Sequence, residues 1–384
     1  MQKVLNVGMV GYKFMGKAHS HAYAVVPKFF QPAAVPVMKA ICGLYPQEAE
    51  AAAKTFGWEG YETDWRRLVE RKDIDLIDIS TPTDSHRDIA VAAAENGKHI
   101  FCEKPMAINL AEAKEMLQAA TKAGVQHLIG FNYRRVPAIA LAKKLIDEGR
   151  LGRIFHWRAV YLQDWIVNPE FPRVWRLEKA VAGSGSLGDL GAHIADLALF
   201  LVGEIASVSA VAETFIKERP LPTAVTGLTA TGGKEKGKVD VDDAVIFMAK
   251  FKNGALGSFE VTRFATGRKN YNGFEINGSK GTIAFNLERL NELQFLSQED
   301  DADSRGFRNI MVTEPTHPYV AAWWPPGHVL GWEASHINEV ADLCDAIGRN
   351  VLPSPSFADG VKNQAVLEAA ARSMESGKWE EVPR

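Results

Sequence analysis

Cysteine is scarce in this sequence, and the cysteines that are present form no pattern. Cys42, Cys102 and Cys344 are the only three, and they are widely spaced with no C-x-x-C pair. This spacing excludes a disulfide framework and gives no sign of a zinc site, so no metal ion is expected. A reducing cytoplasm is the simplest compartment for such a chain.

Long apolar runs and an excess of charge of either sign are also lacking. Asp196 and Glu204 interrupt the most apolar stretch, and no signal-peptide pattern follows the N-terminus. The 44 basic residues nearly balance the 47 acidic residues, for a net charge of −3, and there is no basic run. We therefore expect no membrane span and no nucleic acid or anionic membrane as a partner.

The pattern that is present indicates two domains. The chain has 384 residues, of which 46% are hydrophobic, and this length exceeds what one core usually serves. Residues 1–131 alternate short apolar segments with helical periods, which predicts an α/β Rossmann domain with a parallel sheet. Residues 132–384 predict an α+β domain with a large, mostly antiparallel sheet.

The second domain contains several local signals. A helix is expected at 137–148 and a long strand at 153–163, and Asn253-Gly254 predicts a hairpin. The charged, glycine-rich segment 232–238 is expected to be a solvated loop. Two closing helices, at 333–347 and 360–375, are candidates to pack back on the first domain.

A glycine-rich loop joins the first expected strand to the first helix. It contains Gly11-Tyr12-Lys13-Phe14-Met15-Gly16, in the place of a dinucleotide fingerprint. The helix N-terminus behind it offers free N–H groups to a pyrophosphate. Lys13 replaces the middle glycine, so its ammonium is available to a phosphate or a ribose. The alternative is a glycine-rich turn in an α/β protein that binds no nucleotide.

The end of the second strand bears on cofactor choice. Gly43 stands where a carboxylate for the ribose hydroxyls of NAD is expected, and neither Leu44 nor Tyr45 offers a cation for a 2′-phosphate. NAD is therefore the expected cofactor and NADP the alternative. Lys13 is the one residue that would reverse this preference by reaching the phosphate.

Three side chains are candidates for catalysis. Lys104 follows the fourth strand, where an ammonium can bind a substrate hydroxyl and lower its pKa. Asp189 and His193 are spaced i, i+4, which predicts one helix face with the carboxylate orienting the imidazole as a general base and raising its pKa. Asp196 is the alternative partner of His193. The competing interpretation is a surface lysine in a turn and a structural aspartate and histidine.

Taken together, these motifs resemble the Gfo/Idh/MocA oxidoreductase family over essentially the whole chain. The segment Thr81-Pro82-Thr83-Asp84-Ser85-His86 is similar to the T-P-N-x-x-H turn of that family. The resemblance implies an NAD(P)-binding Rossmann domain, and an open-faced sheet domain that binds a sugar or polyol and forms a homodimer or homotetramer. It also implies that Lys104, Asp189 and His193 are the catalytic set. The implied cofactor residues are Gly11, Lys13, Phe14, Met15, Gly16, Thr81, Pro82, His86, Glu103, Lys104, Trp175 and Arg176.

Residues 14–20, 131–135 and 161–165 are similar to the branch that contains levoglucosan and glycoside 3-dehydrogenases. The expected substrate residues are Arg134, Gln163, Trp165, Asp189, His193 and His328. We therefore expect an NAD(P)-dependent dehydrogenase that oxidises a secondary hydroxyl of a cyclic sugar, anhydrosugar or glycoside. The alternatives are an inositol dehydrogenase, an NAD-dependent glycoside hydrolase that uses transient oxidation, and a nucleotide sensor without chemistry.

Overall fold

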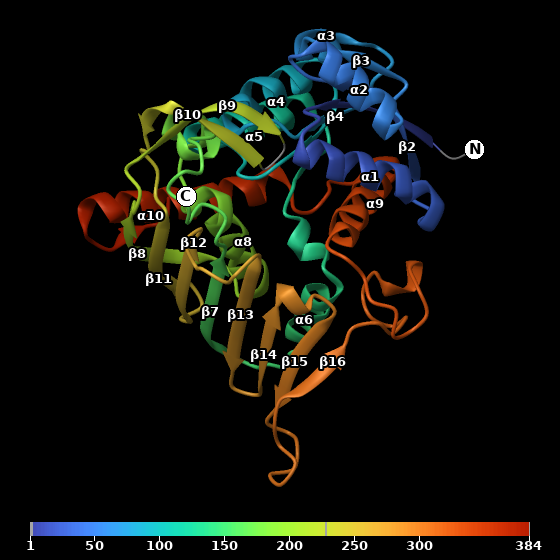
Figure 1. The fold of residues 1–384 in the computed structure, drawn as a ribbon. Helices are drawn as coiled ribbons and strands as arrows, with labels where there is room; N and C mark the ends of the chain where they lie inside the picture. The colour runs from blue at the N-terminus through green and yellow to red at the C-terminus, as the bar shows by residue number, and fades with distance from the viewer. Residues whose placement is uncertain (1–2, 227–228, 384) are drawn as a thin grey trace.

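The first sheet contains six parallel strands in the order β3-β2-β1-β4-β5-β6, in a computed structural model that describes residues 3–226 and 229–383 (Figure 1). This is the doubly wound order of dinucleotide-binding domains, in which ligands bind at the carboxyl ends of the strands. The strands are β1 (Lys3–Val10), β2 (Ala34–Cys42), β3 (Gly60–Glu62), β4 (Leu76–Ile79), β5 (His99–Cys102) and β6 (His127–Ile129).

Five helices join these strands, and two of them begin at a side-chain cap. They are α1 (Phe14–Phe29), α2 (Pro46–Phe56), α3 (Trp65–Glu70), α4 (His86–Glu95) and α5 (Leu110–Ala123). The Asn109 side chain caps α5 by accepting from the Glu112 N–H, and Gly124 ends it at a φ of 67°. Among the described residues, no helix has the length and apolar character needed to cross a bilayer.

The second sheet is large and mostly antiparallel, as predicted, with one parallel pair. Its nine strands run in the order β16-β15-β14-β13-β7-β12-β11-β8-β17, and only β7 and β12 are parallel neighbours. The predicted hairpin joins β11 and β12. The bounds are β7 (Ile154–Leu162), β8 (Ile205–Glu213), β11 (Ala244–Phe251), β12 (Leu256–Thr262), β13 (Tyr271–Gly278), β14 (Gly281–Asn286), β15 (Glu292–Ser297), β16 (Arg308–Met311) and β17 (Glu380–Glu381).

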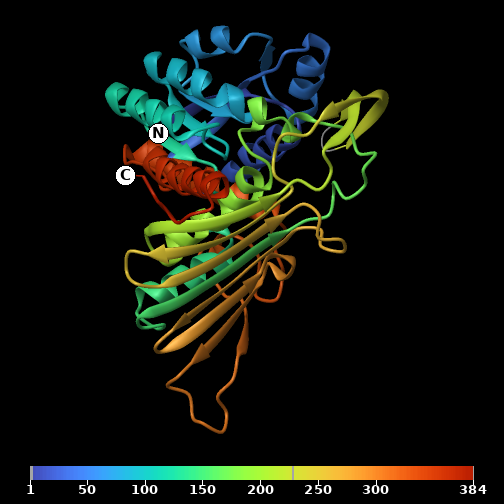
Figure 2. The same ribbon diagram turned by 90° about the vertical axis from the view of Figure 1, so that its left-hand side faces the viewer.

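One face of this sheet is covered and the other is open. Helices α6 (Pro137–Asp147), α8 (Ala192–Leu201) and α10 (Phe357–Ser376) pack on it and share its core. Figure 2 shows α10 between this sheet and the first domain, and the loop between β15 and β16 at the far end of the molecule. Helix α9 (Glu333–Arg349) instead packs against α1 and the first sheet.

The expectation of a loop at residues 232–238 is wrong. This segment belongs to β10 (Thr229–Lys238), which pairs antiparallel with β9 (Glu218–Thr226) in a separate two-stranded ribbon. The segment has no alternation of apolar and polar residues because most of its side chains are exposed. Backbone hydrogen bonds to β9 hold it in place, and these leave no signal in the sequence.

Candidate active site

The loop between β1 and α1 forms a cradle that only glycine permits. Gly11 has a φ of +113°, and a Cβ there would lie 2.7 Å from the Ser80 carbonyl oxygen. A Cβ at Gly16 would lie 2.3 Å from the Gly11 carbonyl oxygen. The first turn of α1 has no side-chain cap. Its N–H groups therefore face the space in which a pyrophosphate binds in this fold, so the residues present fit a dinucleotide.

A tyrosine ring occupies the position of the missing ribose carboxylate. A Cβ on Gly43 would lie 1.7 Å from a ring carbon of Tyr12, so a larger residue would displace that ring. Glu48, in the first turn of α2, instead forms an ion pair with Lys13 and accepts a hydrogen bond from the Tyr12 hydroxyl. The hydrogen bonds from Lys13 and Tyr12 lower the pKa of Glu48.

Lys104 and Asp189 meet directly. The Lys104 Nζ donates to the backbone oxygen of Asp189 at 2.9 Å and lies 3.5 Å from its Oδ1. The Arg263 guanidinium, which is fully buried, lies 3.7 Å from the other carboxylate oxygen. Burial opposes the ionised form of Asp189, but Lys104, Arg176 and Arg263 outweigh burial and lower its pKa. Asp189 is therefore an anion held by cations.

The predicted contact between Asp189 and His193 is not formed. No hydrogen bond or ion pair joins them in the described residues. The reason is local: residues Leu187–Gly191 form a π-helical turn, so the i, i+4 spacing does not place the two side chains on one α-helical face. Burial and the charge of Lys104 lower the pKa of His193 well below its usual value, so the expected rise of this pKa is also wrong.

His193 packs against two tyrosines at the start of a chain of polar groups. Its ring centre lies 4.5 Å from that of Tyr133 and 5.8 Å from that of Tyr161, and its buried Nδ1 has no partner among the described residues. The two tyrosine hydroxyls lie 2.8 Å apart, and Tyr161 donates to Asn270 Oδ1 at 2.7 Å.

The polar chain continues to two of the expected substrate residues. Gln163 Nε2 donates to Asn270 Oδ1 at 2.8 Å, and Trp165 Nε1 donates to Gln163 Oε1 at 3.0 Å. Tyr133 and Tyr161 lie in segments that the sequence singled out, but no role was assigned to them. Asn270 has no local signal, because it reaches the site from the segment before β13.

Two other expected substrate residues are engaged elsewhere. Arg134 donates from Nε and Nη2 to both oxygens of Asp196, at 2.8 and 2.5 Å, and both side chains are buried. This bidentate pair satisfies Arg134 and removes Asp196 as a partner of His193. His328 lies in an exposed loop, where its Nδ1 is 2.9 Å from the Pro325 carbonyl oxygen.

The remaining expected cofactor residues lie around the same strand ends. The ring nitrogens of His86 lie 2.9 Å from the Thr81 carbonyl oxygen and 3.0 Å from the Pro105 carbonyl oxygen. This buried ring therefore connects the loop after β4 to the loop after β5. Phe14 stacks on Trp332, with ring centres 5.6 Å apart. Arg176 lies over the Trp175 ring, where it adds positive charge near Asp189.

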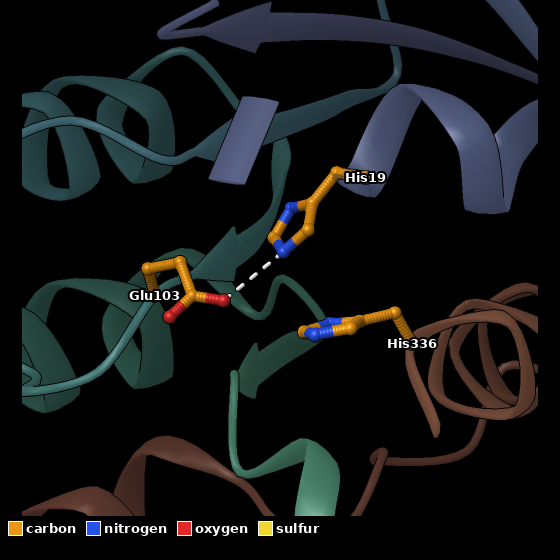
Figure 3. A group of neighbouring side chains, drawn as sticks. All are labelled: His19, Glu103 and His336. Atoms are coloured by element: carbon orange, nitrogen blue, oxygen red, sulfur yellow. Dashed lines mark hydrogen bonds and ion pairs between the residues drawn. The ribbon is translucent and has the colours of Figure 1, made fainter. Parts of the chain in front are cut away.

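A buried group of two histidines and a glutamate behind this site has the composition of a metal centre. Figure 3 shows His19 from α1, Glu103 after β5 and His336 from α9 pointing toward one another, and their ligand atoms lie within 4.8 Å. However, both nitrogens of His19 are bonded to carboxylates, at 2.9 Å to Asp78 and 3.0 Å to Glu103.

The third residue, His336, also lacks a free lone pair. The Ser335 hydroxyl donates to the Trp332 carbonyl, so it accepts from Asn132 Nδ2 at 2.8 Å. That contact fixes the orientation of the Asn132 amide, whose Nδ2 then donates to His336 Nε2 at 3.2 Å. The proton of neutral His336 is therefore on Nδ1, and the group as it stands does not offer the ligands that a metal requires.

A parallel sheet with a glycine cradle, and a lysine, an aspartate and a histidine gathered beside its strand ends, define a nucleotide-dependent oxidoreductase. The chain belongs to the Gfo/Idh/MocA family. Residues 5–131 match the family described as "Oxidoreductase family, NAD-binding Rossmann fold", and residues 139–284 match the "GFO/IDH/MocA C-terminal domain". The protein is therefore an NAD-binding oxidoreductase, as the motifs predicted.

The chain is similar to characterised relatives over its full length. It is 48% identical over 385 residues to the levoglucosan dehydrogenase of Pseudarthrobacter phenanthrenivorans, which covers 99% of this chain and 98% of that protein. A levoglucosan dehydrogenase solved with NADH and levoglucosan is 47% identical, with a TM-score of 0.94 and complete coverage of both chains. An oxidoreductase domain protein from Kribbella flavida is 52% identical, with a TM-score of 0.95 and the same coverage.

Proposed function

We propose that this enzyme is a sugar dehydrogenase that oxidises a secondary hydroxyl of a cyclic anhydrosugar, with levoglucosan as the first candidate. One observation supports this proposal above the others. Lys104 contacts Asp189 in the same site that holds His193 and the hydrogen-bonded side chains from Tyr133 to Trp165. A ring of hydroxyls needs several directional donors and acceptors, together with flat apolar faces, and this site supplies both. The full-length similarity to a levoglucosan dehydrogenase supports the same substrate class.

The three catalytic residues have separate roles in this proposal. The Lys104 ammonium binds the reacting hydroxyl and stabilises the charge that develops on its oxygen. His193, which its surroundings keep neutral, accepts the hydroxyl proton. Asp189 holds the Lys104 ammonium in place, which replaces the expected role of orienting His193. Bound NAD would supply the acceptor for the hydride that leaves the carbinol carbon.

The cofactor residues and the domain division remain proposals of the same kind. Gly11, Gly16 and the start of α1 would hold the pyrophosphate, and Phe14, Met15, Thr81, Pro82 and Glu103 would line the dinucleotide. Residues 1–131 would form the cofactor domain and 132–384 the substrate domain. The enzyme would act in the cytoplasm, which agrees with its three free cysteines.

The open face of the large sheet supports a homodimer or homotetramer. Alternate residues of neighbouring strands expose apolar side chains there, with Val211 68%, Ile246 52% and Leu256 56% exposed. Val211 and Ile246 are cross-strand neighbours, and neighbouring apolar residues that are exposed in this way are typical of protein contacts. Light scattering should give a multiple of the chain mass, and Ile246→Lys should lower that multiple without affecting NADH binding.

The test of the activity is a substrate screen with both cofactors. Purified protein is incubated with NAD or NADP and with levoglucosan, glucosides or inositols, and the absorbance of the reduced cofactor is followed. We expect net NADH formation with levoglucosan. Preference for an inositol would change the substrate class, whereas sugar release from a glycoside without net NADH would indicate a hydrolase. Binding of NADH without turnover of any substrate would indicate a sensor.

A further inference from the structure

His19 is completely buried between two acidic side chains. Its Nδ1 lies 2.9 and 3.0 Å from the two oxygens of Asp78, and its Nε2 lies 3.0 Å from Glu103 Oε1. The Tyr23 hydroxyl also donates to Asp78, at 2.9 Å. Phe101 packs on the face of the imidazole ring, with the two ring centres 4.7 Å apart.

This arrangement determines the charge of His19. An imidazole donates from both nitrogens only when it is protonated, and here each nitrogen faces a carboxylate oxygen. Burial disfavours the charged ring, but Asp78 and Glu103 outweigh burial and raise the pKa of His19 well above its usual value. His19 is therefore a buried imidazolium.

The far side of Glu103 reaches the candidate catalytic lysine. Glu103 Oε2 accepts from the backbone N–H of Lys104 at 3.1 Å. Gly130 leaves the space that this carboxylate occupies, since a Cβ there would lie 2.9 Å from Glu103 Oε1. A continuous line of contacts thus runs from Asp78 through His19 and Glu103 to the backbone of Lys104.

We propose that His19 is a positioning residue, whose imidazolium keeps Glu103 ionised and oriented so that Glu103 fixes the backbone of Lys104. The proposal rests on the proposed role of Lys104 in the oxidation. It gives the histidine after the glycine loop a function in catalysis, although no substrate or cofactor contact is ascribed to it. It also explains why two carboxylates are tolerated in the interior of the first domain.

The other titratable groups around Glu103 make His19 difficult to replace. From α9, His336 and Glu339 are directed at the same region, where burial lowers the pKa of His336 to about 3 and raises that of Glu339 to about 8. His336 is therefore neutral, and Glu339 adds negative charge when it ionises. Lys104 is the remaining cation beside Glu103. Without the imidazolium, Glu103 would be a buried carboxylate that has lost its hydrogen bond from His19, and it would take up a proton.

The test compares His19→Gln with His21→Gln, a matched substitution at an exposed position of the same helix. We expect His19→Gln to lower kcat/KM roughly 10- to 100-fold through misplacement of Lys104. In this variant, kcat/KM and the affinity for NADH should also fall at acidic pH. This acidic limb is expected because Glu103 becomes protonated within the pH range of the assay. The double variant His19→Gln/Glu103→Gln should lose this limb, since an amide does not titrate. His21→Gln should follow the wild type.

The outcomes that overturn the proposal are specific. A pH profile of His19→Gln that superimposes on the wild type contradicts it, and so does a limb that persists in the double variant. If His19→Gln does not fold, Asp78→Asn weakens the imidazolium from its other side and should produce a smaller limb of the same sign. The NADH titrations need no substrate, so they test His19 even if levoglucosan is not oxidised, which would instead contradict the proposed function.

Discussion

Two histidines near the active site differ in charge, because His193 is neutral and His19 is a cation. His193 has a lysine nearby and aromatic rings around it, so its neutral form is favoured. His19 lies between Asp78 and Glu103, so its protonated form is favoured. Both rings are buried, which alone would favour the neutral form in each case. The identity of the contacting groups therefore decides the charge, and the sequence gives those contacts only indirectly.

Removal of the Lys104 ammonium is the most direct test of the active site. Lys104→Ala is expected to lower kcat roughly 10²- to 10⁴-fold, because both the stabilisation of the developing alkoxide and the hold on the hydroxyl are lost. The Kd for NADH, measured by fluorescence titration, should change much less. Lys122→Ala, on the exposed side of α5, is the control. Near wild-type kcat in Lys104→Ala would mean that the reaction is carried out elsewhere.

The role of His193 predicts a particular pH dependence. Because its pKa is lowered from about 6.5, His193 should stay neutral throughout the neutral range. The rate of oxidation should therefore fall only as the pH drops through this lowered pKa. His193→Asn should cut kcat roughly 10²-fold or more and remove this limb. A steady-state pH series on both proteins measures this, and an unchanged limb in the variant would assign the proton to another group.

Asp189→Asn distinguishes the observed contacts from those expected from spacing. If Asp189 acted on His193, its loss would move the acidic limb to lower pH. The structure pairs Asp189 with Lys104 and Arg263 instead. We therefore expect kcat to fall roughly 10-fold or more while the limb keeps its position. An acidic limb that moves to lower pH in Asp189→Asn would show that Asp189 acts on His193 after all.

At the level of the elements, local signals predicted well and long-range contacts did not. The glycines at 11 and 16 indicated the cofactor loop because their constraint lies within the loop itself. The π-helical turn at Leu187–Gly191 could not be anticipated, since i, i+4 spacing assumes a regular helix. The pairing of Arg134 with Asp196 spans 62 residues, and sequence spacing gives no indication of such a contact.

The contact between the β1–α1 loop and α2 predicts a determinant of cofactor preference. We expect Glu48 to act in place of the carboxylate that is absent at Gly43, because Glu48 pairs with Lys13 of the loop and its charge would repel a 2′-phosphate. Glu48→Gln should release Lys13 and shift the ratio of NADPH to NADH affinity toward NADPH by roughly 3- to 10-fold. Titration of both reduced cofactors measures the ratio.

Glu50→Gln, at an exposed position of the same helix, is the matched control for Glu48→Gln. An equal ratio in Glu48→Gln and the wild type would show that another group discriminates between the cofactors. A shift of similar size in Glu50→Gln would show a general effect of charge on this surface rather than a contact of Glu48.

At the scale of the whole molecule, buried neutral histidines predict a loss of stability in mild acid. Burial lowers the pKa of His127 to about 4 and that of His336 to about 3, compared with about 6.5 in an unfolded chain. Below about pH 6.5 these two side chains therefore bind more protons in the unfolded chain than in the folded one. Their contribution to stability is present above this pH and is lost as the pH falls toward 4.

Calorimetry between pH 7.5 and 5 measures this effect as a falling Tm. The variant His127→Gln should show a shallower fall, because one of the suppressed protonations is removed. His21→Gln, whose side chain is exposed, should keep the wild-type slope. A His127→Gln variant with the wild-type slope would contradict the prediction.

The path of the chain through the two sheets has a consequence for its synthesis. The apolar flank of the first sheet, formed in part by Leu5 and Val7, is covered by Ile337, Val340 and Leu343 of α9. While the ribosome is still translating the second sheet, that flank lacks the part of its cover that α9 provides, although its strands were among the first to emerge. A nascent chain that stops before Glu333 would present this surface to chaperones and proteases. The first domain to be made is therefore among the last to be completed.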